Sequence, residues 1–98
     1  MFDVEITVEA ENDLDIIASY YRRQILNGIE QHLVHRPTEE SRSRIKRLRL
    51  LDSPAYRLRV DDYRVYYDVD EEMQVVTVLR ILNKDESLRY LRDLENQS

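Results

Sequence analysis

The chain has 98 residues, enough for one small domain spanning positions 1–98, and 42% of them are hydrophobic, enough for a core. It has no cysteine, which excludes a disulfide framework and a thiolate metal site, and no apolar run approaches the roughly 18 residues that span a bilayer. The net charge of -5 argues mildly against a nucleic-acid-binding protein, but the cations are concentrated between positions 42 and 64. The acidic N-terminus is unlike a secretory signal, so we expect a cytoplasmic protein without a membrane partner.

The first third of the chain predicts a strand followed by helix. Positions 2–8 alternate apolar and polar residues, which is typical of a half-buried strand. From position 9 to about 36, apolar residues recur every three or four positions, so this stretch is one long helix or a helical hairpin broken near 18–23. Gly28 would cost about 1 kcal/mol inside a helix, which indicates close packing there. Pro37 ends the helical pattern.

The remainder predicts strands and a closing helix. Positions 44–51 (RIKRLRLL) fit a strand, a helical turn or an extended lead-in. Positions 74–82 are apolar on both faces, as an interior strand would be. Asn83, with Glu86 three positions later, suits the cap of a final helix. Consecutive strands with short connections must be antiparallel, so we expect an α+β fold with the helices on one face of an antiparallel sheet of three to four strands.

Two strand-like runs, at positions 56–60 and 63–69, flank an acidic turn at Asp61 and Asp62 and should form a hairpin. Successive side chains of a strand point to opposite faces. The apolar set can therefore enter the core while three arginines gather on the other face; we call Arg57, Arg59 and Arg64 the arginine surface. The alternative is an ordinary solvent face on which Arg64 pairs with Asp68 or with a helix acid.

The order of these elements, and the stretches RIKRLR, YRLRVDDYRVYYDVDEE and NKDESLRY, resemble the RelE/ParE superfamily of bacterial toxins from type II toxin-antitoxin modules. The resemblance covers nearly the whole chain. It implies an N-terminal strand, a pair of helices and a curved antiparallel sheet that together form a cleft. It also implies two activities: RelE-like members cut messenger RNA in the ribosomal decoding site without a metal or other cofactor, whereas ParE-like members inhibit DNA gyrase.

The resemblance implies five catalytic positions, occupied here by Arg57, Arg59, Arg64, Lys84 and Tyr90. The first two replace lysines of the RelE-type pattern, and Lys84 replaces an arginine. Guanidinium binds phosphate but is a poor proton shuttle, because its pKa lies above about 12. We therefore expect RNA binding to survive better than acid-base catalysis, with Lys84 as general acid and Tyr90 as a base or as the residue that orients the 2′-hydroxyl. A tyrosine base would need a pKa well below the usual value near 10.

The sequence thus predicts a toxin that inhibits translation by ribosome-dependent cleavage of messenger RNA. The alternatives are a gyrase inhibitor and a catalytically weakened toxin that acts mainly through antitoxin binding. All three predict a cognate antitoxin, bound in a toxin-antitoxin hetero-oligomer, and the first adds the ribosome and messenger RNA as partners.

Other polar residues have simpler interpretations. Arg80, inside an apolar strand, should take part in a structural salt bridge. Tyr66 shares the arginine face and is better interpreted as a tyrosine at the edge of the core than as a base-stacking residue. His32 and His35 lack an evident third ligand, so we expect no metal site.

Overall fold

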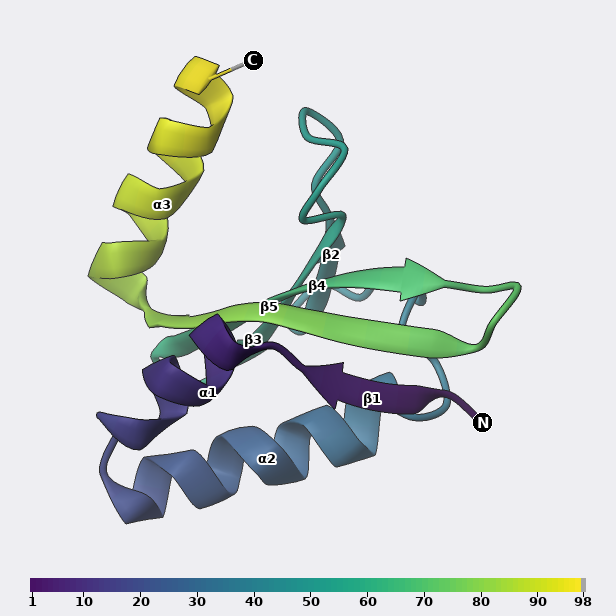
Figure 1. Cartoon of the computed structure of the whole chain (residues 1–98), viewed down its shortest axis with the longest axis horizontal. Coiled ribbons are helices and arrows are strands. Elements are labelled where there is room, and N and C mark those ends of the chain that lie inside the picture. Colours follow the sequence, from purple (N-terminus) through teal and green to yellow (C-terminus); the bar gives the residue numbers. More distant parts are fainter. Residues whose placement is uncertain (98) are drawn as a thin grey trace.

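The computed structural model describes residues 1–97 and contains five strands and three helices. In chain order they are β1 (Asp3–Ile6), α1 (Val8–Asp15), α2 (Ser19–Leu33), β2 (Ile45–Arg47), β3 (Tyr56–Val60), β4 (Tyr63–Asp70), β5 (Val75–Asn83) and α3 (Lys84–Gln97) (Figure 1). The sheet has the order β1-β5-β4-β3-β2, with β1 parallel to β5 and the other neighbours antiparallel. The α+β class is confirmed, and β5 is the interior strand expected at positions 74–82. No helix within residues 1–97 is both long and apolar enough to cross a membrane.

The helices lie on both sides of the sheet. Helices α1 and α2 cover one face, whereas α3 rises from the other (Figure 1). The expectation that all helices share one face is therefore wrong for α3. Asn83, the last residue of β5, also caps α3: its Oδ1 accepts from Glu86 N at 2.8 Å, and its N–H donates to Glu86 Oε1 at 3.4 Å. The two hydrogen bonds form the expected capping box. Because α3 begins directly after β5, no connecting segment could bring this helix to the face that α1 and α2 cover.

The long helical stretch is a hairpin. Helix α1 ends at Asp15 and α2 begins at Ser19, just before the expected break at 18–23. Arg22 closes the connection, because its Nε donates to Leu14 O at 3.0 Å and its Nη2 to Ile17 O at 2.9 Å. The end of a helix leaves carbonyl groups without intrahelical partners, and this side chain satisfies two of the carbonyls there.

The core lies between the sheet and the α1–α2 hairpin. Its fully buried members come from both layers: Ala10, Ile25, Leu33, Leu58, Val65, Tyr67, Val76 and Val78. Gly28 on α2 faces Val60 on β3, and a Cβ at this glycine would lie only 2.9 Å from Val60 Cγ2. The close packing expected at Gly28 is confirmed.

The hairpin and its neighbours fix which face each side chain takes. Asp61 has a φ of 52°, a left-handed conformation that aspartate tolerates, so the expected acidic turn between β3 and β4 is confirmed. A β-bulge shifts the register of β5 so that Tyr66 pairs with Arg80 but Tyr67 pairs with Val78. Leu79 is the extra residue, and it reverses the alternation along β5. Arg80 therefore leaves the face that Val78 shares with the core and joins the face of Tyr66.

Candidate nucleic-acid interface

The arginine surface is assembled as expected. The register places Arg59 opposite Arg64, and Arg57 opposite Tyr66. Directly paired residues of antiparallel strands lie on the same face, so the three arginines share the surface that points away from the core. Their positive charges also interact, because both Arg57 and Arg59 lower the pKa of Arg64.

Two neighbouring strands extend this surface. Lys46 on β2 lies opposite Arg57, and Arg80 on β5 lies opposite Tyr66. A row of Lys46, Arg57, Tyr66 and Arg80 therefore crosses four strands. Lys46 was not predicted as a site residue because the sequence did not decide between a strand and other conformations for positions 44–51. The alternation of apolar Ile45 and charged Lys46 could have indicated a strand with Lys46 on the solvent face.

Arg64 is the most constrained of the three arginines. Its Nη1 donates to Asp61 O at 3.0 Å and to Tyr63 O at 3.1 Å, so backbone carbonyls of the turn hold the guanidinium. Burial is the largest cause of its lowered pKa. Within residues 1–97, no arginine of the surface forms an ion pair. The alternative pairing with Asp68 is absent, since that carboxylate accepts from Ser53 Oγ and from Ala55 N.

This arrangement favours an anionic ligand. Like charges held together and partly desolvated raise the energy of the free protein, and a bound anion relieves that cost. Guanidinium binds phosphate oxygens in pairs through its planar fork. The lowered pKa of Arg64 does not make it a base, because arginine stays protonated in proteins.

Tyr66 and Tyr90 join the sheet to α3. Their ring centroids lie 5.1 Å apart at an interplanar angle of 56°, and the Arg80 guanidinium lies 5.6 Å from the centroid of Tyr90. Tyr66 is only 1% exposed, which agrees with a core-edge tyrosine and leaves no open ring face for a base. Burial raises the pKa of Tyr90, so its phenol is protonated at neutral pH. The raised pKa of Tyr90 favours a role in orienting the 2′-hydroxyl over a role as a base.

Ser87 is a polar residue of this region that sequence reasoning missed. It is 4% exposed, and its Oγ, like Arg57 Nε, is buried without a hydrogen-bond partner among residues 1–97. Burial raises the pKa of Tyr66, and the nearby Ser87 hydroxyl opposes that increase without reaching hydrogen-bond geometry. Unsatisfied buried groups cost about 1–3 kcal/mol each. The spacing of three from Tyr90, which places both on one helix face, could have identified Ser87.

Arg80 forms the structural salt bridge expected for it. Its Nε lies 2.8 Å from Asp13 Oδ2 and its Nη2 lies 3.1 Å from Asp13 Oδ1, while Ile81 N donates to the same Oδ2 at 2.8 Å. The hydrogen bond that Arg80 donates to Asp13 is the largest cause of the raised pKa of Arg80. Arg80 therefore supports Tyr90 and is neutralised by Asp13, whereas the three arginines of the surface form no ion pair within residues 1–97.

Lys84 is the predicted residue with the least support. It begins α3 and is exposed, two positions after Leu82, the cross-strand partner of Arg64. No side-chain hydrogen bond or ion pair joins Lys84 to the rest of the described chain. Of the five predicted catalytic residues, the three arginines lie on one face of the sheet. Tyr90 packs against Tyr66, which lies on the same face. The catalytic roles of all five stay predictions.

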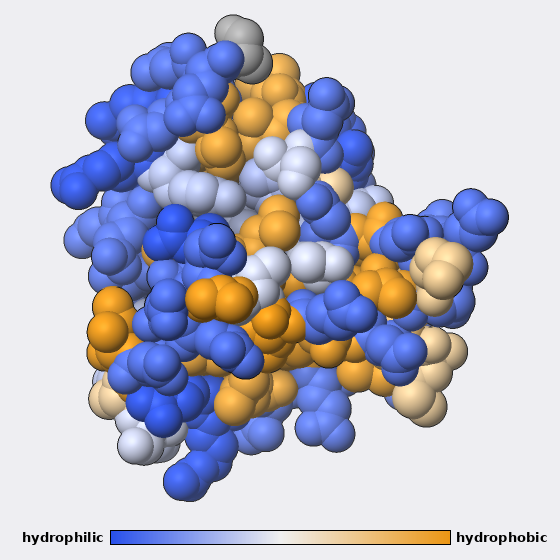
Figure 2. Space-filling view, viewed as in Figure 1, coloured by the Kyte–Doolittle hydropathy of each residue, from blue (hydrophilic) through white to orange (hydrophobic). Residues whose placement is uncertain are grey.

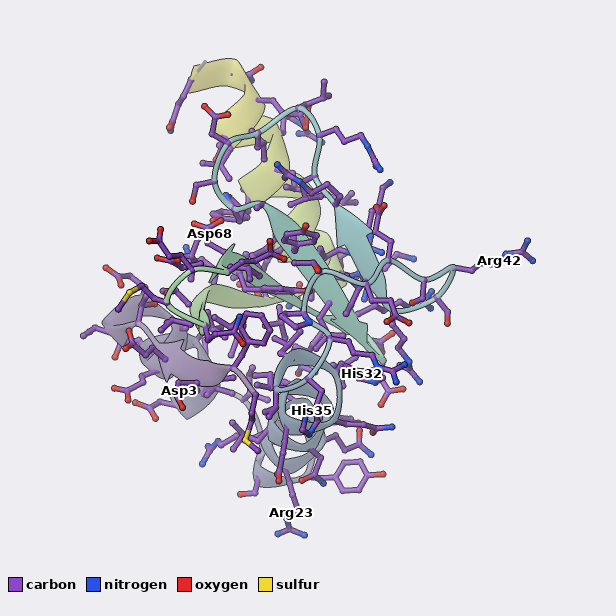
Figure 3. All side chains as sticks on the ribbon, turned by 90° about the vertical axis from the view of Figure 1, so that its right-hand side faces the viewer. Asp3, Arg23, His32, His35, Arg42 and Asp68 are labelled. Carbon is purple, nitrogen blue, oxygen red and sulfur yellow. The ribbon has the colours of Figure 1, made fainter. Side chains whose placement is uncertain are left out.

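The two histidines lie elsewhere. Figure 3 shows His32 and His35 near the end of α2, with Arg42 extending away from the body of the protein. They line a surface cavity of about 490 Å³ together with Arg44. Burial, and secondly Arg44, lowers the pKa of His32. Across residues 1–97 no three His, Asp or Glu side chains are grouped so that they could hold a metal ion.

The sequence from residue 4 to residue 88 matches the family described as the ParE toxin of the type II toxin-antitoxin system, parDE. The chain belongs to the ParE toxin family. This confirms the predicted membership of the RelE/ParE superfamily and makes the protein a toxin of a type II toxin-antitoxin system. No curated protein sequence matches the chain.

Solved structures similar to this ParE-family chain include the isolated E. coli RelE toxin and chains of RelB-RelE complexes. A RelBE toxin-antitoxin complex from Mycobacterium tuberculosis matches with a TM-score of 0.65 at 24% identity, covering 84% of this chain and 96% of that chain. The RelB-RelE complex from Methanococcus jannaschii matches with a TM-score of 0.66 at 20% identity, covering 88% and 96%. The isolated E. coli RelE toxin matches with a TM-score of 0.59 at 17% identity, covering 93% and 99%. At these identities the likeness establishes the fold.

Proposed function

We propose that this toxin blocks translation by cutting messenger RNA on the ribosome, and that the arginine surface binds the RNA backbone. The observation that carries the proposal is the convergence of Arg57, Arg59 and Arg64 on one sheet face, without ion pairs within residues 1–97. Like charges held together and partly desolvated cost free energy, and binding of the anionic RNA backbone offsets that cost. The proposal places the protein in the cytoplasm, where the ribosomes are.

The chemistry follows from these groups. The RNA 2′-oxygen attacks the adjacent phosphorus, the bond from phosphorus to the 5′-oxygen breaks, and the products carry a 2′,3′-cyclic phosphate and a 5′-hydroxyl. Arg64, with Arg57 and Arg59, stabilises the negative charge of the pentacovalent transition state. The protonated phenol of Tyr90 orients the 2′-hydroxyl, and Lys84 supplies the proton to the leaving 5′-oxygen. The ribosome or solvent must then accept the proton of the 2′-hydroxyl, which fits a dependence on the ribosome.

A cognate antitoxin is the second partner of this proposal. The similar structures from Mycobacterium tuberculosis and Methanococcus jannaschii are toxin-antitoxin complexes. We infer that this toxin is likewise held in a hetero-oligomer by its antitoxin. The expected antitoxin is the product of a small gene adjacent to the toxin gene, and its co-expression should restore growth.

Primer extension on a translated message tests the nuclease directly. The purified toxin is added to a reconstituted translation reaction and to the same message without ribosomes. New 5′ ends with ribosomes and none without them support the proposal. No new ends in either reaction would reject it.

Lysine reversion tests whether catalysis has been weakened. The double variant Arg57→Lys/Arg59→Lys restores side chains whose pKa can be lowered by neighbouring cations, whereas the pKa of arginine cannot be brought into a useful range. We expect the variant to cut at least about tenfold faster, since a positioned general acid or base contributes about 10²–10⁴-fold. Cleavage by the variant but not by the natural chain would identify a weakened toxin.

Gyrase inhibition is the second candidate. It is favoured by the family match, which is to ParE toxins, and by the two arginines at positions where the RelE-type pattern has lysines. A supercoiling assay with purified gyrase separates the candidates. Inhibition at a stoichiometric amount of toxin, with intact message in the ribosome assay, would favour the second.

A further inference from the structure

The cationic surface of the sheet continues past the arginine surface to Arg44. The carbonyl of Arg44 accepts from Arg59 N at 2.9 Å, so the pairing of β2 with β3 extends one residue before β2 and places Arg44 opposite Arg59. Arg59 lies opposite Arg64 in turn. Three arginines therefore form a row across three neighbouring segments. Like charges directly opposite one another destabilise a sheet, and a bound anion offsets that cost.

Arg44 also lines the cavity at the end of α2. Its Nη1 donates to Arg59 O at 3.3 Å, which holds the guanidinium at the edge of the sheet. The cavity, of about 490 Å³, is lined by Arg44 together with His32, His35 and Arg36. Figure 3 shows both histidines at the end of α2. We call this space the histidine cavity, and Arg44 joins it to the row of arginines on the sheet.

The lining of the histidine cavity carries little negative charge. Glu39 is the one acidic residue among the described residues that line it. It pairs with Arg36 at 3.7 Å, but the side chains are 64% and 75% exposed, so solvent screens this pair strongly. Burial, and secondly the charge of Arg44, lowers the pKa of His32. The cavity therefore favours a ligand that brings negative charge of its own.

Hydroxyl groups add hydrogen-bond donors to the same lining. Ser41 Oγ accepts from Arg44 N at 3.1 Å and from Ile45 N at 3.2 Å, which fixes the oxygen while its proton can still be donated. Ser43 is exposed and also lines the cavity. Guanidinium and hydroxyl groups are donors that phosphate oxygens accept from, and the fork of a guanidinium binds two such oxygens at once. This donor set suits a phosphate group.

We propose that the histidine cavity binds a backbone phosphate of the same RNA strand that crosses the arginine surface, with Arg44 as the link between the two sites. Neighbouring strands lie about 4.8 Å apart, so the backbones of Arg44 and Arg64 are about 10 Å apart, a span of about three nucleotides at 3.4 Å each. The inference rests on the proposed binding of RNA to the arginine surface, but it does not depend on cleavage. An acidic protein segment fits less well, because the continuous row of cations matches the regularly repeated charge of a nucleic acid.

The histidines provide a direct readout of this site, because the chain has two histidines and both line the cavity. Proton NMR of their imidazole Cε1–H resonances follows the purified toxin during titration with single-stranded 2′-O-methyl RNA, which lacks the attacking hydroxyl and is not cut. About eight nucleotides suffice to span both sites. We expect the RNA to move both resonances and to raise the pKa of His32, because a nearby anion favours the imidazolium. Inorganic phosphate is the second arm, and equal shifts at an equal concentration of phosphate groups would overturn the shared strand in favour of the free ion.

The salt dependence of RNA binding tests the role of Arg44. Each phosphate contact with a single strand contributes about 0.7 to the slope of log affinity against log salt. Arg44→Gln should therefore reduce the steepness of that slope by about 0.7 and weaken binding about fivefold in 0.1 M salt, relative to the natural chain. Arg42→Gln is the matched control, since Arg42 has the same charge, is exposed and extends away from the body of the protein (Figure 3). It should keep the natural slope and affinity.

The outcomes separate this proposal from the proposed function. Histidine resonances that RNA leaves unmoved, while Arg64→Gln still weakens RNA binding, would overturn the cavity and leave the arginine surface as the RNA site. Resonances that move with the purified antitoxin but not with RNA would also overturn it, in favour of an acidic protein segment. Resonances that move with RNA, in a toxin that leaves ribosome-bound message intact, would support the cavity and count against the nuclease alone.

Discussion

The pair of Asp13 on α1 and Arg80 on β5 should contribute substantially to stability. Asp13 accepts two hydrogen bonds from the guanidinium, at 2.8 and 3.1 Å, and one from Ile81 N at 2.8 Å. The side chains are 12% exposed for Asp13 and 36% for Arg80, so solvent screens the pair only in part. Charges about 4 Å apart attract by about 4 kcal/mol at an effective dielectric constant near 20, whereas fully exposed pairs are worth about 0.2–1 kcal/mol.

A double-mutant cycle measures this contribution. Discounting the Coulomb value for the exposure of Arg80, we expect a coupling energy of about 1.5–3 kcal/mol between Asp13→Ala and Arg80→Met. The single variant Asp13→Ala should lose about 3 kcal/mol of unfolding free energy, because it also removes the acceptor of Ile81 N. Arg80→Met keeps the apolar stem beside Tyr90. Urea unfolding of the four proteins, monitored by circular dichroism, gives the four free energies.

The result that would refute this reasoning is a coupling energy below about 0.5 kcal/mol, which is the behaviour of a solvent-exposed pair. A large coupling with unchanged folding of α3 would support the structural role assigned to Arg80. As a control, the exposed pair of Arg49 and Glu40, at 70% and 41% exposure, should give a coupling near the low end of the surface range.

Two further predictions concern the core and follow from single contacts. Gly28→Ala should lower the melting temperature despite the better helix propensity of alanine, because its Cβ would lie 2.9 Å from Val60 Cγ2 and overpacking costs about 1–3 kcal/mol. In the Val60→Ala background, where this contact is removed, Gly28→Ala should cost less stability than it does in the natural chain. An equal or higher melting temperature for Gly28→Ala would contradict this packing. Burial raises the pKa of Tyr67 above its usual value near 10, so the folded state keeps a proton that the unfolded state loses. Stability should therefore be constant below about pH 10 and fall as the pH rises above it, and urea unfolding at pH 8 and pH 10.5 measures the fall. Tyr67→Phe should reduce that fall but cost about 1–3 kcal/mol at neutral pH, since Pro37 O loses a donor at 2.7 Å; an undiminished fall in the variant would assign it to other groups.

The parts of the fold that follow strict local patterns could be predicted from the sequence. The alternation of positions 56–60 and 63–69 placed the three arginines on one face, because the side-chain period of a strand is two. The cap of α3 was predictable because Asn83 and Glu86 form a local capping box. The break in the long helical stretch could not be located in the same way, since Arg22 closes it through carbonyls five to eight residues away.

The parts of the site that depend on non-local geometry could not be predicted. The bulge at Leu79 decides the face of Arg80, and only the register against β4 reveals the bulge. The side of the sheet on which α3 lies, and with it the contact of Tyr90 with Tyr66, is decided by which face α1 and α2 already cover. Ser87 was missed because a serine on an amphipathic helix ordinarily faces solvent.

The central claim is that the arginine surface stabilises the cleavage of ribosome-bound message, and the rate of that cleavage under single-turnover conditions tests it most directly. Arg64→Gln removes a guanidinium near Arg57 and Arg59, and Arg23→Gln, at an exposed position on α2, serves as the control with the same change of charge. We predict that Arg64→Gln cuts at least about a hundredfold more slowly than the natural chain, as expected when one transition-state donor is lost, while Arg23→Gln cuts at the natural rate. Equal rates for the two variants would contradict the account.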